Sequence, residues 1–149
     1  MRGKLDVAFL SGVQFDNKGN VNASVIGDYN KPKVRLPGGA GSAVLIPTAK
    51  KPIIWRSVHN KRTFVEKLDF ITTKGNLYRI VTPLCIFKMV NGEVVLESIH
   101  STSSLEEVIE NTSFEIKYDQ LKVTDDPTIK EMSILRQIDP KKIRYSEFK

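Results

Sequence analysis

Short apolar runs separated by turn residues fill the first two thirds of the chain. Val7–Leu10 is a continuous apolar run of strand length that ends at Ser11–Gly12, and it predicts a buried strand. The Asp, Asn and Gly residues at positions 16–20 predict a tight turn. A returning strand is expected from Val21 to Ile26. This region therefore indicates strands and not helices.

The middle of the chain carries the clearest strand signals. Pro52–Val58 predicts a strand that starts at a proline, which is tolerated where no ladder donor is needed. Tyr78–Val90 and Glu93–Ile99 are rich in β-branched and aromatic residues and flank Asn91–Gly92, which is the pattern of a type I′ hairpin. Phe64–Thr72 has an ambiguous pattern that fits no single element.

The last third of the chain predicts two helices. Ser103 or Ser104 is placed to cap a first helix over Leu105–Asn111. For the second helix, Asp126–Pro127 has the residue types of an N-cap and a first helical position, and Asp139–Pro140 ends it. The apolar positions of the second helix recur at Ile129, Met132, Leu135 and Ile138.

Length and composition indicate one packed domain over residues 1–149. The chain is 40% hydrophobic, and its 23 Lys and Arg against 17 Asp and Glu give a formal net charge of +6. The single cysteine, Cys85, excludes an internal disulfide and reads as buried and inert. His59 and His100 stand 41 residues apart, which excludes a paired-histidine metal motif, and both read as ordinary polar residues near strand ends. No metal site is expected.

The charge pattern and the absence of a long apolar run limit the expected partners. The basic residues are dispersed and have no interleaved aromatic pair, so solvated surface charge is favoured over a groove for a phosphorylated ligand, and nucleic acid is not expected as a partner. No signal-type or membrane-spanning run is present, so we expect a soluble intracellular domain with no membrane association.

A glycine-rich loop, Pro37–Ala43, follows an extended segment directly. Loops of this kind present bare main-chain amides to an oxyanion or phosphate. The loop lacks the Gly-Lys-Ser/Thr ending of a Walker loop and the spacing of a dinucleotide fingerprint. A tight strand-to-helix connection that needs only small residues is an equally good interpretation.

Several segments together resemble the family I CoA-transferases, most closely the beta chain of the glutaconate CoA-transferase type. Residues 10–22, LSGVQFDNKGNVN, follow that family's pattern Leu-Gly-Ala-x-Gln-Val-Asp-x-x-Gly-Asn-Leu-Asn. Residues 62–72, RTFVEKLDFIT, match its basic-Phe-Val-Glu-x-Val-Asp-Phe-Ile-Thr stretch. Residues 25–38, the hairpin, residues 108–114 and the final Asp-Pro follow in the family's order, so the resemblance covers nearly the whole chain.

The resemblance implies an α/β fold of the CoA-transferase type, with an open, largely parallel sheet flanked by helices, a β-hairpin and C-terminal helices. It also implies that the chain lacks the family's N-terminal portion, which carries the catalytic glutamate, because no glutamate precedes Glu66. The chain departs from the family at Ala40 and Val44 in and after the glycine loop. It departs again at residues 100–102, where His-Ser-Thr replaces His-Pro-Gly.

The function that the resemblance implies is that of a subunit of a multi-chain CoA-transferase, which moves CoA between an acyl-CoA thioester and a carboxylic acid. The expected partners are an alpha subunit and the missing N-terminal part of the beta subunit. CoA is then a substrate, no further cofactor is expected, and no catalytic residue lies in this chain. The expected substrate-binding residues are Gln14, Gly38, Gly39, Ala40, Gly41 and Ser42.

Two alternatives remain beside a transferase subunit. Glutamate-less relatives open CoA-linked rings by water attack, which would make this a hydrolase subunit. A non-catalytic CoA-binding or assembly subunit is the other alternative, and the departures at Ala40 and Val44 favour it somewhat. For Gln14, a role in stabilising the turn is as good an interpretation as substrate binding.

Overall fold

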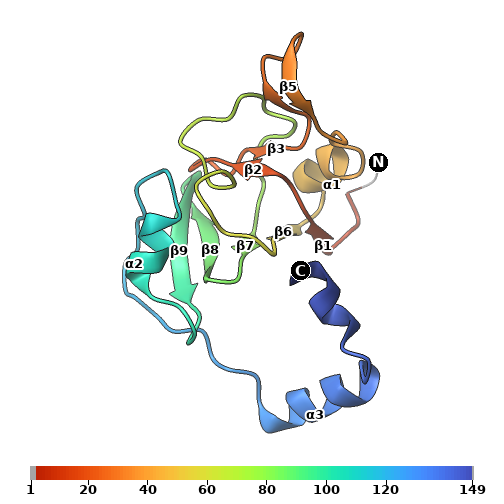
Figure 1. The fold of residues 1–149 in the computed structure, drawn as a ribbon, viewed down its shortest axis with the longest axis vertical. Coiled ribbons are helices and arrows are strands. Elements are labelled where there is room, and N and C mark those ends of the chain that lie inside the picture. Colours follow the sequence, from red (N-terminus) through yellow and green to blue (C-terminus); the bar gives the residue numbers. More distant parts are fainter. Residues whose placement is uncertain (1–2, 149) are drawn as a thin grey trace.

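A five-stranded open sheet forms the centre of the computed structural model, which describes residues 3–148 (Figure 1). Residues 1, 2 and 149 of the predicted domain lie outside the described residues. The sheet order is β1-β6-β7-β8-β9, from Val7–Leu10, Lys51–Trp55, Arg79–Val81, Cys85–Val90 and Glu93–Ile99. The pairs β1–β6 and β6–β7 are parallel, whereas β7–β8 and β8–β9 are antiparallel. The predicted α/β fold with an open sheet is confirmed. The sheet is mixed and not largely parallel, with its parallel pairings in the half that contains β1 and the antiparallel hairpin in the other half.

The hairpin forms where the sequence predicts it. Asn91 and Gly92 have φ values of +51° and +80°, as a type I′ turn requires, and join β8 to β9. The expectation of one strand from Tyr78 to Val90 was wrong, because the chain reverses at residues 82–84. The Thr82 hydroxyl accepts hydrogen bonds from the amides of Leu84 and Cys85 at 3.2 and 3.1 Å, and this turn separates β7 from β8.

Two short antiparallel ribbons precede the glycine loop. The pairs are β2 (Gln14–Phe15) with β3 (Val21–Asn22), and β4 (Val25–Gly27) with β5 (Pro32–Arg35). The predicted turn at residues 16–20 is confirmed, since the Asp16 carboxylate accepts the amides of Lys18 and Asn20, each at 3.0 Å. The expected strand over residues 21–26 is interrupted after β3.

The hydrophobic core lies on one face of the sheet. Helices α1 (Ser42–Thr48) and α2 (Leu105–Glu110) contribute Ile46 and Val108 to it, and both side chains are fully buried. Ser104 caps α2 by accepting the Glu107 amide, as the sequence predicts. The ambiguous segment 64–72 forms an irregular loop, yet it supplies Phe64 to the centre of the core. The other large core side chains are Phe15, Ile54, Ile80, Phe87 and Leu96.

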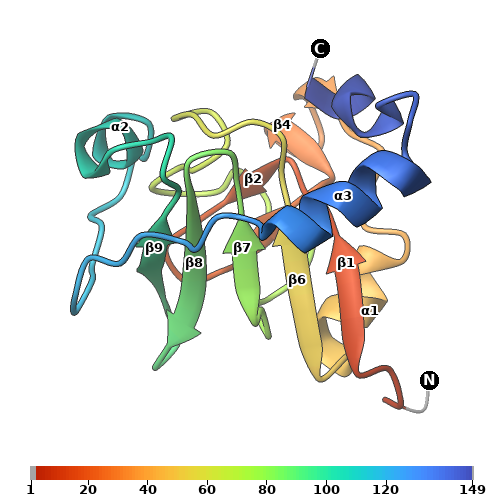
Figure 2. The same cartoon turned by 90° about the horizontal axis from the view of Figure 1, so that it is seen from below.

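Helix α3 (Ile129–Ile138) and the 3₁₀ segment η1 (Ile143–Phe148) lie on the other side of the sheet (Figure 2). The expected start of α3 at Asp126–Pro127 was wrong. Thr128 is the N-cap, because its hydroxyl accepts the Glu131 amide while the Glu131 carboxylate accepts the Thr128 amide. Within residues 3–148, no helix is long and apolar enough to cross a membrane.

Candidate functional site

The glycine loop connects β5 to α1 and is held at both ends. Gly38, with φ +91°, donates its amide to the Ala23 carbonyl at 2.7 Å. The Gly39 carbonyl accepts the Ser42 hydroxyl at 2.6 Å and the Ala43 amide at 3.1 Å. These bonds fix the loop between the ribbons and the first turn of α1.

Close packing explains one of the glycines. A Cβ at Gly39 would lie 2.6 Å from Cγ2 of Thr72 and 2.7 Å from Cβ of Ala43, distances that real side chains do not adopt. A Cβ at Gly41 would instead meet only Cδ1 of Leu45, at 3.8 Å. The tight-connection interpretation therefore accounts for Gly39 but not for Gly41.

The same loop leaves main-chain amides available. Among residues 3–148, the amides of residues 39–42 have no hydrogen-bond acceptor. Ala40 and Gly41 are exposed, and Ala40 has φ +35°. This arrangement fits the presentation of donors to an anionic or carbonyl oxygen.

Gln14 lies in β2 and is hydrogen-bonded to Asn22 in β3. Its side-chain oxygen accepts the Asn22 amide group at 2.9 Å, while its own amide group reaches the Arg62 carbonyl at 3.4 Å. Asn22 is fully buried and also donates to the Val25 carbonyl at 2.7 Å. The side-chain oxygen of Gln14 is therefore already hydrogen-bonded within the fold, whereas its side-chain NH₂ group makes only one long hydrogen bond.

Three cavities in the described part of the chain are lined by other residues. A hollow of about 360 Å³ lies at the carboxyl ends of β1 and β6, where open α/β sheets place ligands. The Arg56 Nε beside it is buried and has no hydrogen-bond partner among the described residues. A second hollow, of about 450 Å³, involves Gly27, Asp28 and residues 67–69. Neither Gln14 nor the glycine loop lines any of the three.

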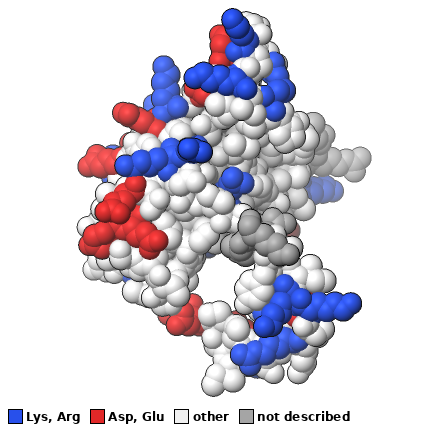
Figure 3. Space-filling view, viewed as in Figure 1, with Lys and Arg blue, Asp and Glu red and all other residues white. Residues whose placement is uncertain are grey.

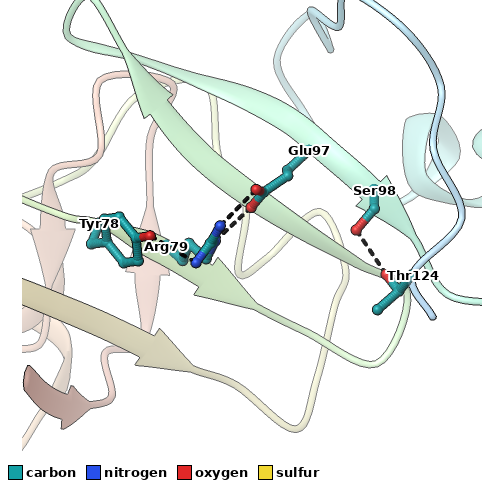
Figure 4. Close-up of polar contacts among 5 residues, drawn as sticks. All are labelled: Tyr78, Arg79, Glu97, Ser98 and Thr124. Carbon is teal, nitrogen blue, oxygen red and sulfur yellow. Dashed lines mark hydrogen bonds and ion pairs between the residues drawn. The ribbon is translucent and has the colours of Figure 1, made fainter. Parts of the chain in front are cut away.

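The third cavity is a groove of about 530 Å³ over β7–β9 and the segment 119–125. Figure 4 shows four of the side chains that line it, those of Arg79, Glu97, Ser98 and Thr124. Its arginine is already paired, because Arg79 donates to both carboxylate oxygens of Glu97 at 2.6 and 2.7 Å and to the Tyr78 hydroxyl at 2.9 Å. The hydrogen bond to Arg79 lowers the pKa of Glu97. Ser98 and Thr124 bond each other at 2.7 Å. These contacts hold the sheet edge together and leave no unpaired arginine in this groove for an anion.

A buried polar cluster lies under the core at His59. The two ring nitrogens are 2.9 Å from the Thr82 hydroxyl and 3.0 Å from the Thr112 hydroxyl. Burial lowers the pKa of His59 to about 4 and raises the pKa of Cys85 to about 12. The predicted burial of Cys85 is confirmed. The histidine is neutral and the thiol protonated at neutral pH, so this pair is a structural cluster.

Among the described residues, the other titratable side chains do not gather at a common site. Glu66 is exposed, and the described residues contain no group of three or more His, Cys, Asp or Glu side chains arranged to hold a metal ion. The burial of His59 between two threonines was not predicted from the sequence. Its partners lie 23 and 53 residues away along the chain, so no local pattern marks them.

Comparison with known proteins places this geometry in a family. Residues 2–111 match the family described as Coenzyme A transferase. The chain is 41% identical to the beta chain of the 3-oxoadipate CoA-transferase of Pseudomonas knackmussii, over 92% of this chain and 60% of that protein. It is 35% identical to the beta chain of the glutaconate CoA-transferase of Acidaminococcus fermentans, over 90% of this chain and 57% of that protein.

Solved structures give the same result. The crystal structure of the glutaconate coenzyme A-transferase from Acidaminococcus fermentans matches with a TM-score of 0.81 at 27% identity, over 96% of this chain and 61% of that chain. The crystal structure of the decarboxylase AibA/AibB matches with a TM-score of 0.90 at 26% identity, over 97% of this chain and 61% of that chain. This chain spans about three fifths of the length of these proteins. It belongs to the coenzyme A transferase family.

Proposed function

We propose that this chain is part of the beta subunit of a multi-chain CoA-transferase that moves CoA between an acyl-CoA thioester and a carboxylic acid. The observation that carries the proposal is the set of main-chain amides at residues 39–42, which have no acceptor among the described residues of a chain from this family. The similarity to the beta chains of two CoA-transferases, over most of this chain, supports the same assignment.

The chemistry explains why such amides are useful. When a carboxylate attacks a thioester carbonyl, negative charge develops on the carbonyl oxygen, and preorganised N–H donors stabilise it. In our proposal Gly38, Gly39, Ala40, Gly41 and Ser42 form the loop that binds this oxygen. The side-chain amide of Gln14, whose present bond to the Arg62 carbonyl is 3.4 Å long, is a further donor to the substrate.

The attacking group is proposed to come from outside this chain. The described glutamates are surface side chains or, like Glu97, held in ion pairs. We therefore expect the nucleophilic glutamate on the part of the beta subunit that this chain lacks, with an alpha subunit completing the enzyme in the cytoplasm. CoA and the acyl-CoA are substrates in this scheme, and no resident cofactor is involved.

Reconstitution tests the proposal. The chain is purified alone and together with an alpha subunit and the remaining part of a beta subunit, and CoA transfer to a carboxylate is measured. We expect transfer from the assembled set only. Transfer by the single chain contradicts the proposal, as does an assembled set that hydrolyses CoA-linked rings or merely binds CoA.

A pair of variants at Gly41 tests the loop itself. Gly41→Pro removes one amide N–H while its φ of −63° suits proline, whereas Gly41→Ala keeps the amide and meets no close atom. We expect the proline variant to lose about tenfold or more in kcat, as for the removal of one oxyanion donor. Its melting temperature should also fall, because Ala40 has φ +35° and a residue before proline favours the extended region. If both variants are folded and have equal kcat values, the amide of residue 41 takes no part in catalysis, which contradicts the proposed role of the loop.

A further inference from the structure

The side chain of Asn22 is oriented by the backbone around it. It is fully buried, and its oxygen accepts the main-chain amides of Ser24 and Val25 at 3.0 and 3.3 Å. Its nitrogen donates to the Val25 carbonyl at 2.7 Å. Because a backbone amide only donates and a carbonyl only accepts, these contacts allow Asn22 a single orientation, in which its NH₂ group also faces Gln14.

The orientation of Asn22 decides which way the Gln14 amide faces. The Asn22 NH₂ group is a donor, so the Gln14 atom that meets it at 2.9 Å has to be the oxygen. The NH₂ group of Gln14 then points the other way, where its one acceptor among residues 3–148 is the Arg62 carbonyl at 3.4 Å. An NH₂ group carries two N–H donors, so one donor of this half-buried side chain has no acceptor in the described part of the chain.

The segment that orients Gln14 also holds the glycine loop. Ala23 follows Asn22 directly, and its carbonyl accepts the Gly38 amide at 2.7 Å. The Thr72 hydroxyl accepts the Ala23 amide at 2.9 Å and fixes this residue from the other side. Neighbouring Cα atoms are about 3.8 Å apart, so Gln14 and the start of the loop are anchored on adjacent residues. The unused donors of Gln14 and of the loop are therefore within reach of one bound substrate.

The charges next to this segment favour a negatively charged ligand group. Residues 25–35, the β4–β5 ribbon that follows it, contain three basic residues, Lys31, Lys33 and Arg35, against one acidic residue, Asp28. Figure 3 shows mostly Lys and Arg side chains at the ribbon end of the molecule, and a group of acidic side chains on the side where α2 lies. A basic surrounding attracts anions, so an anionic oxygen suits the donors held here.

We infer that Asn22 is a positioning residue, which turns the NH₂ group of Gln14 towards the substrate and its side-chain oxygen away from it. Gln14 then binds only a hydrogen-bond acceptor. In the assembled enzyme this acceptor is a negatively charged oxygen, that of the substrate carboxylate or of the thioester carbonyl as it is attacked. The identity of the substrate rests on the proposed function, whereas the orientation of Gln14 does not.

Side-chain NMR of the chain alone tests the orientation. Both N–H groups of Asn22 are buried and hydrogen-bonded, so they should exchange slowly with solvent, whereas the NH₂ group of Gln14 should exchange fast. Gln14→Glu keeps an oxygen facing Asn22 and should leave the slow exchange of Asn22 in place. Gln14→Met removes that oxygen, so one N–H of Asn22 should exchange faster. Slow exchange at Gln14 together with fast exchange at Asn22 overturns the inference.

Kinetics of the assembled enzyme test the role. Gln14→Glu replaces the outward NH₂ group by an oxygen and should lower kcat about tenfold or more, as for the removal of one oxyanion donor. Gln120→Glu makes the same change of charge at an exposed side chain and should leave kcat unchanged. Asn22→Ser keeps an oxygen that accepts the Ser24 amide but is too short to reach Gln14, so kcat should fall in this variant as well.

A double variant separates positioning from a general loss of structure. If Asn22 acts through Gln14, adding Asn22→Ser to Gln14→Glu should lower kcat no further. Two losses that multiply, or a wild-type kcat in either single variant, overturn the inference. Urea unfolding verifies that each variant is folded, and should Asn22→Ser not fold, the exchange rates of the wild type still decide the orientation. A wild-type assembly without CoA transfer rejects the proposed function and leaves the NMR test of Asn22 and Gln14 in force.

Discussion

His59 makes the stability of the domain sensitive to acid. Its folded-state pKa is about 4, against an ordinary value of 6.5, because burial disfavours the charged ring. Below pH 6.5 the unfolded chain therefore binds a proton that the folded chain resists, and stability falls as the pH drops from 6.5 towards 4. The loss approaches ~3 kcal/mol at the lower limit.

Urea unfolding between pH 7 and pH 4 measures this loss. His59→Gln keeps a hydrogen-bonding group between Thr82 and Thr112 but does not titrate, so its stability should vary less across this range. If the free energy of unfolding varied equally with pH in the wild type and in His59→Gln, the acid sensitivity could not be assigned to His59.

The glycine loop allows a second test at single residues. Gly39→Ala places a Cβ 2.6 Å from Cγ2 of Thr72, and overpacking of this kind costs about 1–3 kcal/mol. Gly41→Ala meets its nearest atom at 3.8 Å and should change stability by less than about 0.5 kcal/mol. Urea midpoints measure both variants, and an equal effect at the two positions would show that Gly39 is not packed against Thr72.

At the scale of elements, the two capped helices should respond differently to loss of their caps. Ser104→Ala removes the cap of α2, which buries Val108 in the core, so the whole domain should lose about 1 kcal/mol. Thr128→Ala removes an equivalent cap from α3, which buries nothing, so only α3 should fray. Hydrogen exchange of the α3 amides together with the urea midpoint of the domain separates the two effects. A shift of the midpoint in Thr128→Ala would mean that α3 packs on the body.

The elements also show what the sequence predicts and what it does not. The Asn91–Gly92 turn and the Ser104 cap follow from local patterns, and the structure confirms them. It also confirms a strand over Val7–Leu10 but not its predicted burial, because Val7 and Phe9 are exposed and only Ala8 is buried. The break at residues 82–84 and the true cap at Thr128 were missed, because each depends on a side-chain hydrogen bond that competes with an equally good local signal. The glycine loop was recognised, but the contact that requires Gly39 involves Thr72, a residue far along the chain.

At the scale of the whole molecule, the chain divides into a packed body and a C-terminal arm. Among the residues whose side chains are described, no hydrogen bond or ion pair joins residues 127–146 to the body, whereas Ser101 bonds Asp126 at 2.7 Å. The segment 117–123 belongs to the body, since it covers the edge of β9. Helix α3, the regular part of this arm, has no buried side chain.

Truncation tests this division. A chain ending at Asp126 should unfold cooperatively at nearly the temperature of the full chain, within a few degrees. Its Cys85 thiol should stay unreactive, because the thiol is fully buried and its pKa is about 12. A chain ending at Ile116 loses the strand-like cover of β9 and should melt at a clearly lower temperature with faster thiol labelling. If removal of residues 127–149 alone exposed Cys85, the arm would pack against the core and the division into body and arm would be wrong.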